Sequence, residues 1–177
     1  MEQNTQETEL SLAEQFRNRV VLKVAKIIKV EQHPNGEFLF ILTLEVGDEE
    51  PRQIVSSIVP FYKAEELQDK HIVIVYNLKP ANFRGVRSNG MLLAAADPTV
   101  TDRETCEVLF APQFEPGTQL EPEGLEPLEE KLCYVKPDKF FSFPLTTQDG
   151  FVMVDGKKIG ADGKYLTAEV YKNGTVG

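Results

Sequence analysis

The chain has 177 residues with a formal net charge of −9, and 41% of its residues are hydrophobic. This length predicts one domain, or one domain with a small companion, with enough apolar residues for a packed core. No stretch approaches the roughly 18 apolar residues of a membrane helix, and the polar, acidic start does not look like a secretory signal. We therefore expect a cytoplasmic protein whose two cysteines, Cys106 and Cys133, are buried reduced thiols rather than a disulfide.

The acidic charge lies at the two ends of the chain. Residues 1–18 carry one basic and four acidic side chains, residues 19–98 carry ten of each, and residues 99–177 carry eight basic and fourteen acidic. The stretch 70–96 has no carboxylate and four cations, Lys70, Lys79, Arg84 and Arg87. We expect a polyanionic partner to be bound there, although the negative charge elsewhere weakens long-range attraction.

The sequence of the N-terminal part predicts a short polar segment followed by strands. Residues 1–18 are expected to be a polar linker or a marginal helix, with Leu10, Ala13 and Phe16 on one stripe. The globular part then begins near Arg19. Residues 20–30 are rich in β-branched side chains and lack Gly and Pro, which favours a strand.

The next segments predict a small barrel. Apolar residues alternate from Phe38 to Val46, which points them to one face of a strand. Further strands are expected at 53–59, 71–76 and 91–96, with a short helix at 61–68. Five strands, a short helix and no long helix are typical of the OB-fold, a five-stranded Greek-key barrel. The fold class expected for the chain is therefore mainly all-β, with an OB-fold barrel at residues 19–98.

The second half, residues 99–177, predicts a small β-rich subdomain. Five glutamates in residues 121–130 indicate a solvated surface or a short acidic helix, and Phe140, Phe141 and Phe143 need burial. A hairpin is expected at 151–159 around Asp155-Gly156, and a last strand at 165–171. About 75 residues are marginal as an independent unit, so we expect this subdomain to pack on the barrel.

The sequence offers little material for an enzyme. His33 precedes a proline in a turn and His71 opens a hydrophobic strand, so we interpret them as a surface turn histidine and a strand-edge histidine. No metal-binding, phosphate-binding or dinucleotide-binding motif is present. We expect no catalytic residues, no metal and no cofactor.

The informative segment is the connection between the last two barrel strands, residues 77–91. It combines cations for phosphates with amides and an aromatic ring for bases, in the place where OB-folds carry a binding loop. A solvated loop whose Pro and Gly only set turns is an equally good interpretation of these residue types alone. The candidate binding residues are Arg52, Asn77, Lys79, Asn82, Arg84, Arg87, Ser88 and Met91.

Several segments in order resemble the tRNA-binding domain family typified by endothelial-monocyte-activating polypeptide II. The same domain occurs in a yeast synthetase cofactor and at the C-terminus of some methionyl-, tyrosyl- and lysyl-tRNA synthetases. The resemblance covers roughly residues 19–177. The matching segments are Leu22–Ile27, His33-Pro34, Glu45–Gly47, Pro51–Ile58, Asn77–Ala81, Arg84–Val86, Ser88 three before Met91, Leu109–Pro112 and Pro116-Gly117.

This resemblance implies an OB-fold that binds the outer corner of tRNA by shape, with little preference among tRNAs. It also implies that the C-terminal subdomain imitates the second subunit of dimeric relatives, so that the chain stays monomeric. Ser88 and Met91 match the family's tRNA-contact pair, and Arg52, Lys79 and Arg84 match its basic residues. A synthetase or multisynthetase assembly is then a possible further partner. The chain departs from the family in its acidity, in Ala25 where Gly is usual, and in a shorter turn after His33-Pro34.

Two functional hypotheses follow. The first is a non-catalytic tRNA-binding module, appended to an aminoacyl-tRNA synthetase, that raises the local concentration of tRNA. The second is a protein-interaction or cytokine-like signalling module with weakened RNA affinity, whose partner meets the acidic stretch at 121–130. The family's cytokine segment corresponds to residues 23–29. The cluster of cations between Lys70 and Arg87 favours the first hypothesis.

Overall fold

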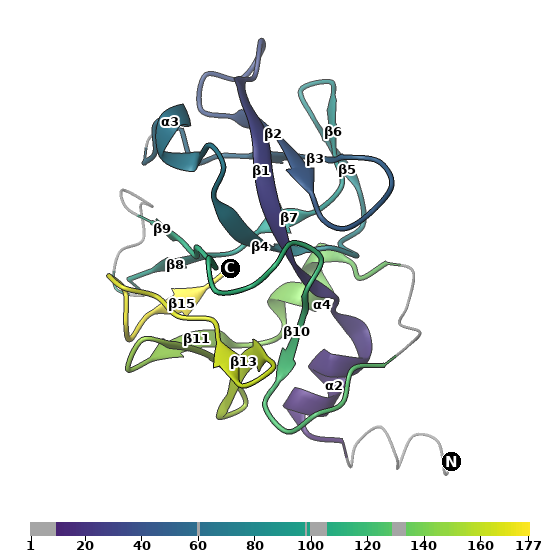
Figure 1. Cartoon of the computed structure of the whole chain (residues 1–177), viewed down its shortest axis with the longest axis vertical. Coiled ribbons are helices and arrows are strands. Elements are labelled where there is room, and N and C mark those ends of the chain that lie inside the picture. Colours follow the sequence, from purple (N-terminus) through teal and green to yellow (C-terminus); the bar gives the residue numbers. More distant parts are fainter. Residues whose placement is uncertain (1–9, 60, 98, 100–105, 129–133) are drawn as a thin grey trace.

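The computed structural model describes residues 10–59, 61–97, 99, 106–128 and 134–177. These residues form a mainly β structure with a few short helices, which confirms the predicted fold class at that level. The assignment to an OB-fold stays a prediction. Figure 1 shows the N-terminal strands in the upper part of the molecule and the C-terminal strands below them.

The N-terminal strands pair antiparallel around one apolar cluster. β1 (Leu22–Gln32) pairs with β2 (Phe40–Glu45) and β4 (His71–Val75). β2 also pairs with β3 (Arg52–Ser56), and β4 with β7 (Met91–Leu92). The short helix α3 (Ala64–Leu67) lies between β3 and β4 in the chain. The cluster between these elements includes Ile27, Leu42, Ile54, Leu67, Ile72 and Ile74.

Two details of the predicted strands were wrong. Phe38 was expected to share the buried face of its strand, but it precedes β2 and its side chain is 59% exposed. The apolar run at 91–96 is divided into β7 and β8 (Ala94–Ala96), because its two halves pair with different partners. β8 pairs with β9 (Glu107–Val108) and β15 (Thr175–Val176).

The stretch predicted as a loop-rich connection contains a hairpin. β5 (Ala81–Phe83) and β6 (Val86–Ser88) pair antiparallel, with Phe83 opposite Val86. The two turn residues between them, Arg84 and Gly85, both have positive φ, 49° and 88°. Turns of this kind match the twist of the flanking strands and favour glycine, which explains Gly85.

The C-terminal half is β-rich and is joined to the N-terminal strands by strand pairing. β10 (Gln119–Pro122) pairs with β1 on one side and with β13 (Lys157–Ala161) on the other. The hairpin expected around Asp155-Gly156 is β12 (Phe151–Val154) with β13. β11 (Leu145–Gln148) pairs with β12 and β15, and β14 (Lys164–Tyr165) with β13. A short helix, α4 (Pro137–Phe141), precedes β11.

Three expectations for this half need correction. The stretch 121–130 was expected to be a solvated surface or a short acidic helix; Glu123 and Glu126 are exposed, but Glu121 belongs to β10 and is buried, and residues 129 and 130 lie outside the described part. Phe140 and Phe143 are buried, whereas Phe141 is 57% exposed because it follows Phe140 on a short helix with one buried side. The strand expected at 165–171 is limited to its first residue, in β14.

The N-terminal segment forms a packed helix over its described residues. α2 (Leu12–Arg19) begins at a capping box in which Ser11 accepts from the backbone N–H of Glu14, and the Glu14 side chain accepts from Ser11. Such a cap satisfies backbone donors that the first helical turn leaves unpaired. Ala13 and Phe16 are buried, and the Phe16 ring meets Phe143 edge-on at 5.4 Å. The helix therefore packs on the C-terminal half.

A second apolar cluster joins the two halves. Along β1 and β4 the side chains alternate: Ala25 and Ile72 point to the first cluster, while Val24 and Val73 point to the second. The second cluster also contains Leu120, Val152, Ile159 and Phe140 from the C-terminal half. β4 and the first half of β1 are therefore buried on both faces, and the C-terminal half covers the face that points away from the first cluster.

The expectations about membrane helices, cysteines and metal ligands can be compared only with the described residues. Within those residues, no helix is both long enough and apolar enough to cross a membrane. Cys106 is half-buried, and Cys133 lies outside the described residues, so the expectation of reduced thiols stays a prediction. The described part contains no group of three or more potential metal ligands.

Candidate nucleic-acid interface

The β5–β6 hairpin carries the exposed cations of the candidate site. Lys79 precedes it, Arg84 stands in its turn and Arg87 lies on β6; all three side chains are exposed, as is Asn82 on β5. Arg84 donates one hydrogen bond to the carbonyl of Asn35 at 3.0 Å. A guanidinium has five N–H donors, so this contact orients the side chain and leaves donors for a phosphate.

The tip of the hairpin is fastened to the turn between β1 and β2 by a buried histidine. Nδ1 of His33 accepts from the backbone N–H of Asn35 at 2.9 Å, so Nε2 carries the proton and donates to the carbonyl of Phe83 at 2.8 Å. His33 was expected on the surface but is only 2% exposed. His71 donates from Nδ1 to the carbonyl of Phe114 at 2.8 Å. Both contacts are structural.

The base of the hairpin is fastened to β3. The hydroxyl of Ser88 accepts from the backbone N–H of Val55 and donates to the carbonyl of Gly90, both at 2.9 Å. The side chain of Gln53 donates to the carbonyl of Arg87 at 2.8 Å. Gly90 has a φ of 145°, and a Cβ there would meet the carbonyl oxygen of Val75 at 3.0 Å. The backbone of Gly90, at the end of the hairpin, therefore packs directly against the backbone of β4.

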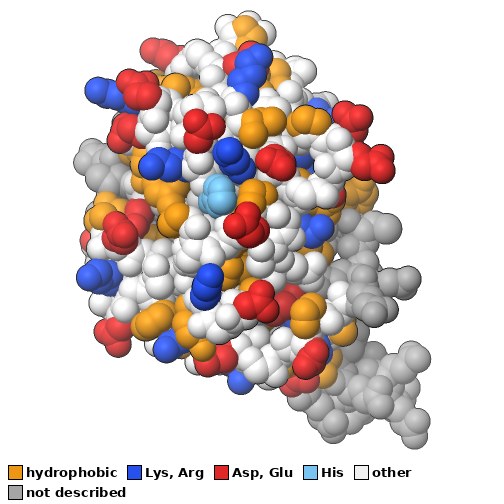
Figure 2. Space-filling model, in the orientation of Figure 1, with side chains coloured by type: hydrophobic (Ala, Val, Ile, Leu, Met, Phe, Trp, Pro, Cys, Tyr) orange, Lys and Arg blue, Asp and Glu red, His pale blue; other side chains and the backbone are white. Residues whose placement is uncertain are grey.

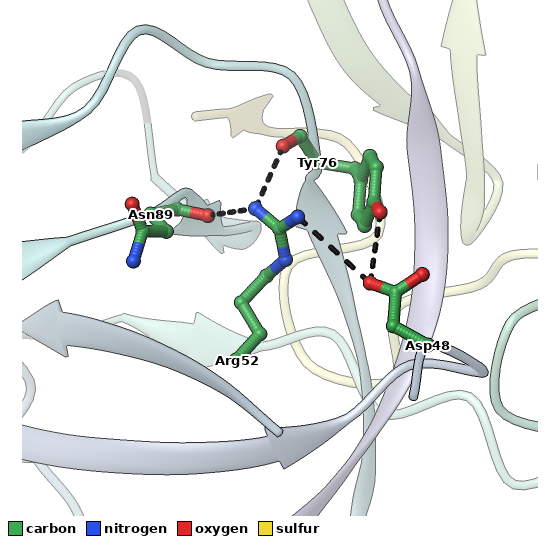
Figure 3. Close-up of polar contacts among 4 residues, drawn as sticks. All are labelled: Asp48, Arg52, Tyr76 and Asn89. Carbon is green, nitrogen blue, oxygen red and sulfur yellow. Dashed lines mark hydrogen bonds and ion pairs between the residues drawn. The ribbon is translucent and has the colours of Figure 1, made fainter. Parts of the chain in front are cut away.

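Arg52 joins three segments beside the hairpin (Figure 3). Its Nη1 donates to the carbonyl of Asn89 at 2.7 Å and to that of Tyr76 at 3.3 Å. Its Nη2 lies 3.9 Å from a carboxylate oxygen of Asp48, and its guanidinium carbon lies 3.9 Å from the centre of the Tyr76 ring. Because its guanidinium contacts Asp48, Tyr76 and Asn89, Arg52 connects the three segments to which these residues belong.

Tyr76 completes this network. Its hydroxyl donates to Asp48 at 2.8 Å, and the Nζ of Lys23 lies 4.1 Å from its ring centre. Burial, followed by the hydrogen bond to Asp48, raises the pKa of the Tyr76 hydroxyl above its ordinary value. Asp48 is therefore held in place by a neutral phenol and a nearby guanidinium.

The remaining candidate residues support the backbone. Asn77 is 6% exposed; its amide donates to the carbonyl of Arg19 and accepts from the N–H of Val21, both at 2.9 Å. Ser88 is 3% exposed, with the partners given above. Met91 is half-buried against the second apolar cluster. Because the side chains of Asn77 and Ser88 are buried and bond to the backbone, these two residues position the site.

A hollow of about 350 Å³ adjoins the hairpin, and sequence reasoning did not find it. Leu78 and Val135 form a parallel bridge, in which the backbone of Val135 bonds to Asn77 and Lys79. This bridge places Tyr134, whose side chain is 56% exposed, at the edge of the hollow. The residues that line the hollow are Asp48, Glu50, Pro51, Arg52, Tyr76, Asn77, Leu78, Pro80, Asn89 and Tyr134.

Charge is mixed over the molecular surface seen in Figure 2. On that face, basic and acidic side chains are interspersed, with no broad area of one sign. On this face, attraction of a polyanion therefore depends on a local group of cations. The hairpin provides such a group because Lys79, Arg84 and Arg87 lie within a nine-residue stretch that has no carboxylate.

The fold and the site together define a mainly β module with an exposed basic hairpin beside a polar hollow. Comparison with known proteins identifies its family. Residues 22–119 match the family model described as putative tRNA binding domain, and the chain belongs to this family.

Three relatives extend the comparison. Methionine–tRNA ligase of Treponema denticola is 38% identical over 181 residues, which cover 97% of this chain and 23% of that protein. This chain thus spans about a quarter of that relative's length. The C-terminal domain of Plasmodium vivax p43 has the same fold, with a TM-score of 0.81 over 90% of this chain and 98% of that one at 24% identity. The structure of a methionyl-tRNA-synthetase-related protein from Pyrococcus horikoshii matches with a TM-score of 0.54 and 31% identity. The match covers 63% of this chain and 97% of that one.

Proposed function

We propose that this chain is a non-catalytic tRNA-binding module and that its parent is a methionyl-tRNA synthetase. The family match supports tRNA binding, and the similarity to part of a methionine–tRNA ligase supports the parent. The single observation that carries the proposal is the anchored hairpin. Its exposed cations stand on a strand pair fixed at the tip by His33 and at the base by Ser88.

Recognition in this proposal depends on shape and phosphate positions. Lys79, Arg84 and Arg87 meet the sugar–phosphate backbone, with Asn82 beside them, and the fixed hairpin sets the spacing of these contacts. Contacts of this kind carry no sequence information directly, so different tRNAs bind with similar affinity. We propose that they meet the outer corner of the tRNA, and that the module holds tRNA near the synthetase active site, where linkage makes capture effectively intramolecular.

The proposal also assigns different roles to the two parts of the chain. Residues 19–98 form the tRNA-binding barrel, and residues 99–177 replace the second subunit of a dimer. The second apolar cluster supports this, because the C-terminal half covers a face of β1 and β4 that is otherwise open. A chain that covers its own apolar face in this way stays monomeric.

The alternative of a signalling or protein-interaction module has less support. The acidic stretch that favoured it is only partly exposed, because Glu121 is buried in β10 while Glu123 and Glu126 are at the surface. The segment equivalent to the family's cytokine segment lies in β1, where Val24, Ala25 and Ile27 are fully buried. A partner has no access to those side chains in the folded protein.

Binding of tRNA across a range of salt concentrations tests the proposal. A footprint of about five phosphates gives a slope of log affinity against log salt on the order of −4. Fluorescence anisotropy with labelled tRNA measures this slope, and competition with a second tRNA and a short single strand measures selectivity. We expect the two tRNAs to compete almost equally and the single strand poorly. A flat salt response contradicts binding through phosphates.

A further inference from the structure

The hollow beside the hairpin has the size of a small-ligand site. Its volume is about 350 Å³, at the lower end of the range for pockets that bind small organic molecules. Four separate parts of the chain line it: residues between Asp48 and Arg52, residues between Tyr76 and Pro80, Asn89, and Tyr134. The Arg52 network holds the first two segments together.

The polar wall of this hollow accepts hydrogen bonds. Asp48, Glu50 and Arg52 all line it, and Nη1 of Arg52 donates to the carbonyls of Tyr76 and Asn89. A carboxylate has about four lone-pair sites; the Tyr76 hydroxyl donates to Oδ2 of Asp48, and Nη2 of Arg52 lies 3.9 Å from that same oxygen. The two carboxylates suit a group with adjacent N–H donors better than they suit a phosphate.

An aromatic face is available at the edge of the hollow. Tyr134 is 56% exposed, so its ring can be covered by a ligand. The Tyr76 ring is already contacted by the cations of Lys23 and Arg52. Stacking on an exposed aromatic side chain is a general way in which proteins hold an unpaired base.

Cations stand around the hollow. Lys79 lies between Leu78 and Pro80, which both line it, and Arg87 donates from Nε to the side chain of Asn89 at 3.1 Å. A nucleotide with its base in the hollow therefore has its phosphate near basic side chains. The lining thus holds two carboxylates and the Arg52 guanidinium, and two further cations, Lys79 and Arg87, lie next to lining residues.

We propose that this hollow takes the guanine base of an unpaired nucleotide, with N1–H and N2–H donating to the Asp48 carboxylate and the ring stacked on Tyr134. Guanine alone among the four bases presents two adjacent donors on its Watson–Crick edge, which matches the two oxygens of a carboxylate. The inference rests on the proposed function, since the base is one that a bound tRNA presents. It adds a contact with a base to a surface that otherwise contacts only phosphates.

Titration of the full chain with mononucleotides, followed by two-dimensional NMR, tests the proposal. GMP is compared with IMP, which lacks the 2-amino group, and with AMP. We expect GMP to bind about tenfold more tightly than IMP, because a hydrogen bond to a charged group is lost, and AMP to bind more weakly than GMP. Asp48→Asn should remove the difference between GMP and IMP.

Glu49→Gln is the matched control, because it removes the same charge one residue away, on an exposed side chain outside the lining of the hollow. It should keep the preference for GMP. Tyr134→Leu should weaken all three nucleotides about equally, because it removes stacking and leaves the carboxylate in place. Thermal melts confirm that each variant is folded.

Titration of the same proteins with tRNA separates this proposal from the proposed function. Weaker tRNA binding by Asp48→Asn but not by Glu49→Gln supports the guanine site. Equal affinities for GMP and IMP in the wild type, with tRNA still bound, overturn the guanine site and leave the tRNA-binding function standing. A preference for GMP without tRNA binding supports the site and overturns the function.

Discussion

The Nε2–H of His33 donates a hydrogen bond to the carbonyl oxygen of Phe83 at 2.8 Å, and so joins the β1–β2 turn to the tip of the β5–β6 hairpin. The two residues are 50 positions apart in the chain. The same imidazole orders its own turn by accepting from the backbone of Asn35. A buried side chain with no reach to the surface therefore sets where the exposed cations of the hairpin stand.

His33→Ala tests this relationship. The substitution removes two buried hydrogen bonds and should reduce the free energy of unfolding by about 1 to 3 kcal/mol. It should also weaken tRNA binding and speed amide hydrogen exchange at Val86, because the tip of the hairpin is released. Denaturant unfolding, anisotropy and exchange measured by NMR give the three quantities.

The second histidine provides the control. His71→Ala also removes a hydrogen bond to a backbone carbonyl, that of Phe114, but this contact is not part of the hairpin. It should destabilise the protein while tRNA affinity stays near the wild-type value. Equal loss of tRNA affinity in both variants would show that stability, and not hairpin position, limits binding.

A carboxylate on β9 is expected to stabilise the C-terminal half without affecting binding. Glu107 accepts three backbone hydrogen bonds, from Glu169, Val170 and Tyr171, at 2.7, 2.9 and 3.0 Å. Glu107→Gln replaces charge-assisted bonds with weaker ones and should cost about 1 to 3 kcal/mol. Glu169→Gln is the control, since its own carboxylate is exposed and only its backbone takes part. Thermal unfolding compares the two, and equal melting temperatures would contradict the role of Glu107.

Removal of residues 99–177 should cause association. The C-terminal half covers Leu22, Val24, Val73 and Val75, which are fully buried in the whole chain. Their exposure creates an apolar patch of the kind that drives protein association. Sedimentation velocity should show a monomer for the full chain and a larger species for the truncated one. A dimeric full chain with an unchanged truncated species would contradict the idea that the C-terminal half replaces a subunit.

Much of the fold is predictable because local signals agree with it. Alternating or continuous apolar runs indicate the positions of β1, β2 and β4, and Asp155-Gly156 indicates the turn of the β12–β13 hairpin. The β5–β6 hairpin was missed because its strands have three residues each and Arg84 occupies a position with positive φ, which is uncommon for arginine. Glu121 was misplaced because glutamate is rarely buried.

The candidate site was predictable only in its exposed cations. Lys79, Arg84 and Arg87 stand out in the sequence because no carboxylate lies near them. The hollow was not predictable, since Asp48, Tyr76 and Tyr134 come from three segments that meet only in the folded chain. Tyr134 carries no signal in its own neighbourhood, because its position depends on the bridge between Leu78 and Val135.

The hairpin arginines themselves give the most direct test of the binding surface. The turn geometry decides which substitutions are suitable: Arg84 has a φ of 49°, a conformation that asparagine tolerates well, and Asn-Gly is a favoured turn pair. Arg84→Asn with Arg87→Gln therefore removes both charges while the hairpin is kept. Surface changes of this kind usually alter stability by less than about 0.5 kcal/mol.

Loss of two charge-assisted phosphate contacts, at about 1 to 2 kcal/mol each, should weaken tRNA binding on the order of a hundredfold and make the salt slope shallower by about 2. Lys164→Ala with Lys172→Ala is the matched control, because it removes two exposed cations from the C-terminal half and leaves the hairpin unchanged. That pair should bind tRNA within about threefold of the wild type, since only long-range attraction is reduced. Anisotropy titrations at several salt concentrations measure both effects, with thermal melts to confirm folding. If the hairpin pair binds like the wild type while the control pair loses affinity, the tRNA-binding surface lies on the C-terminal half.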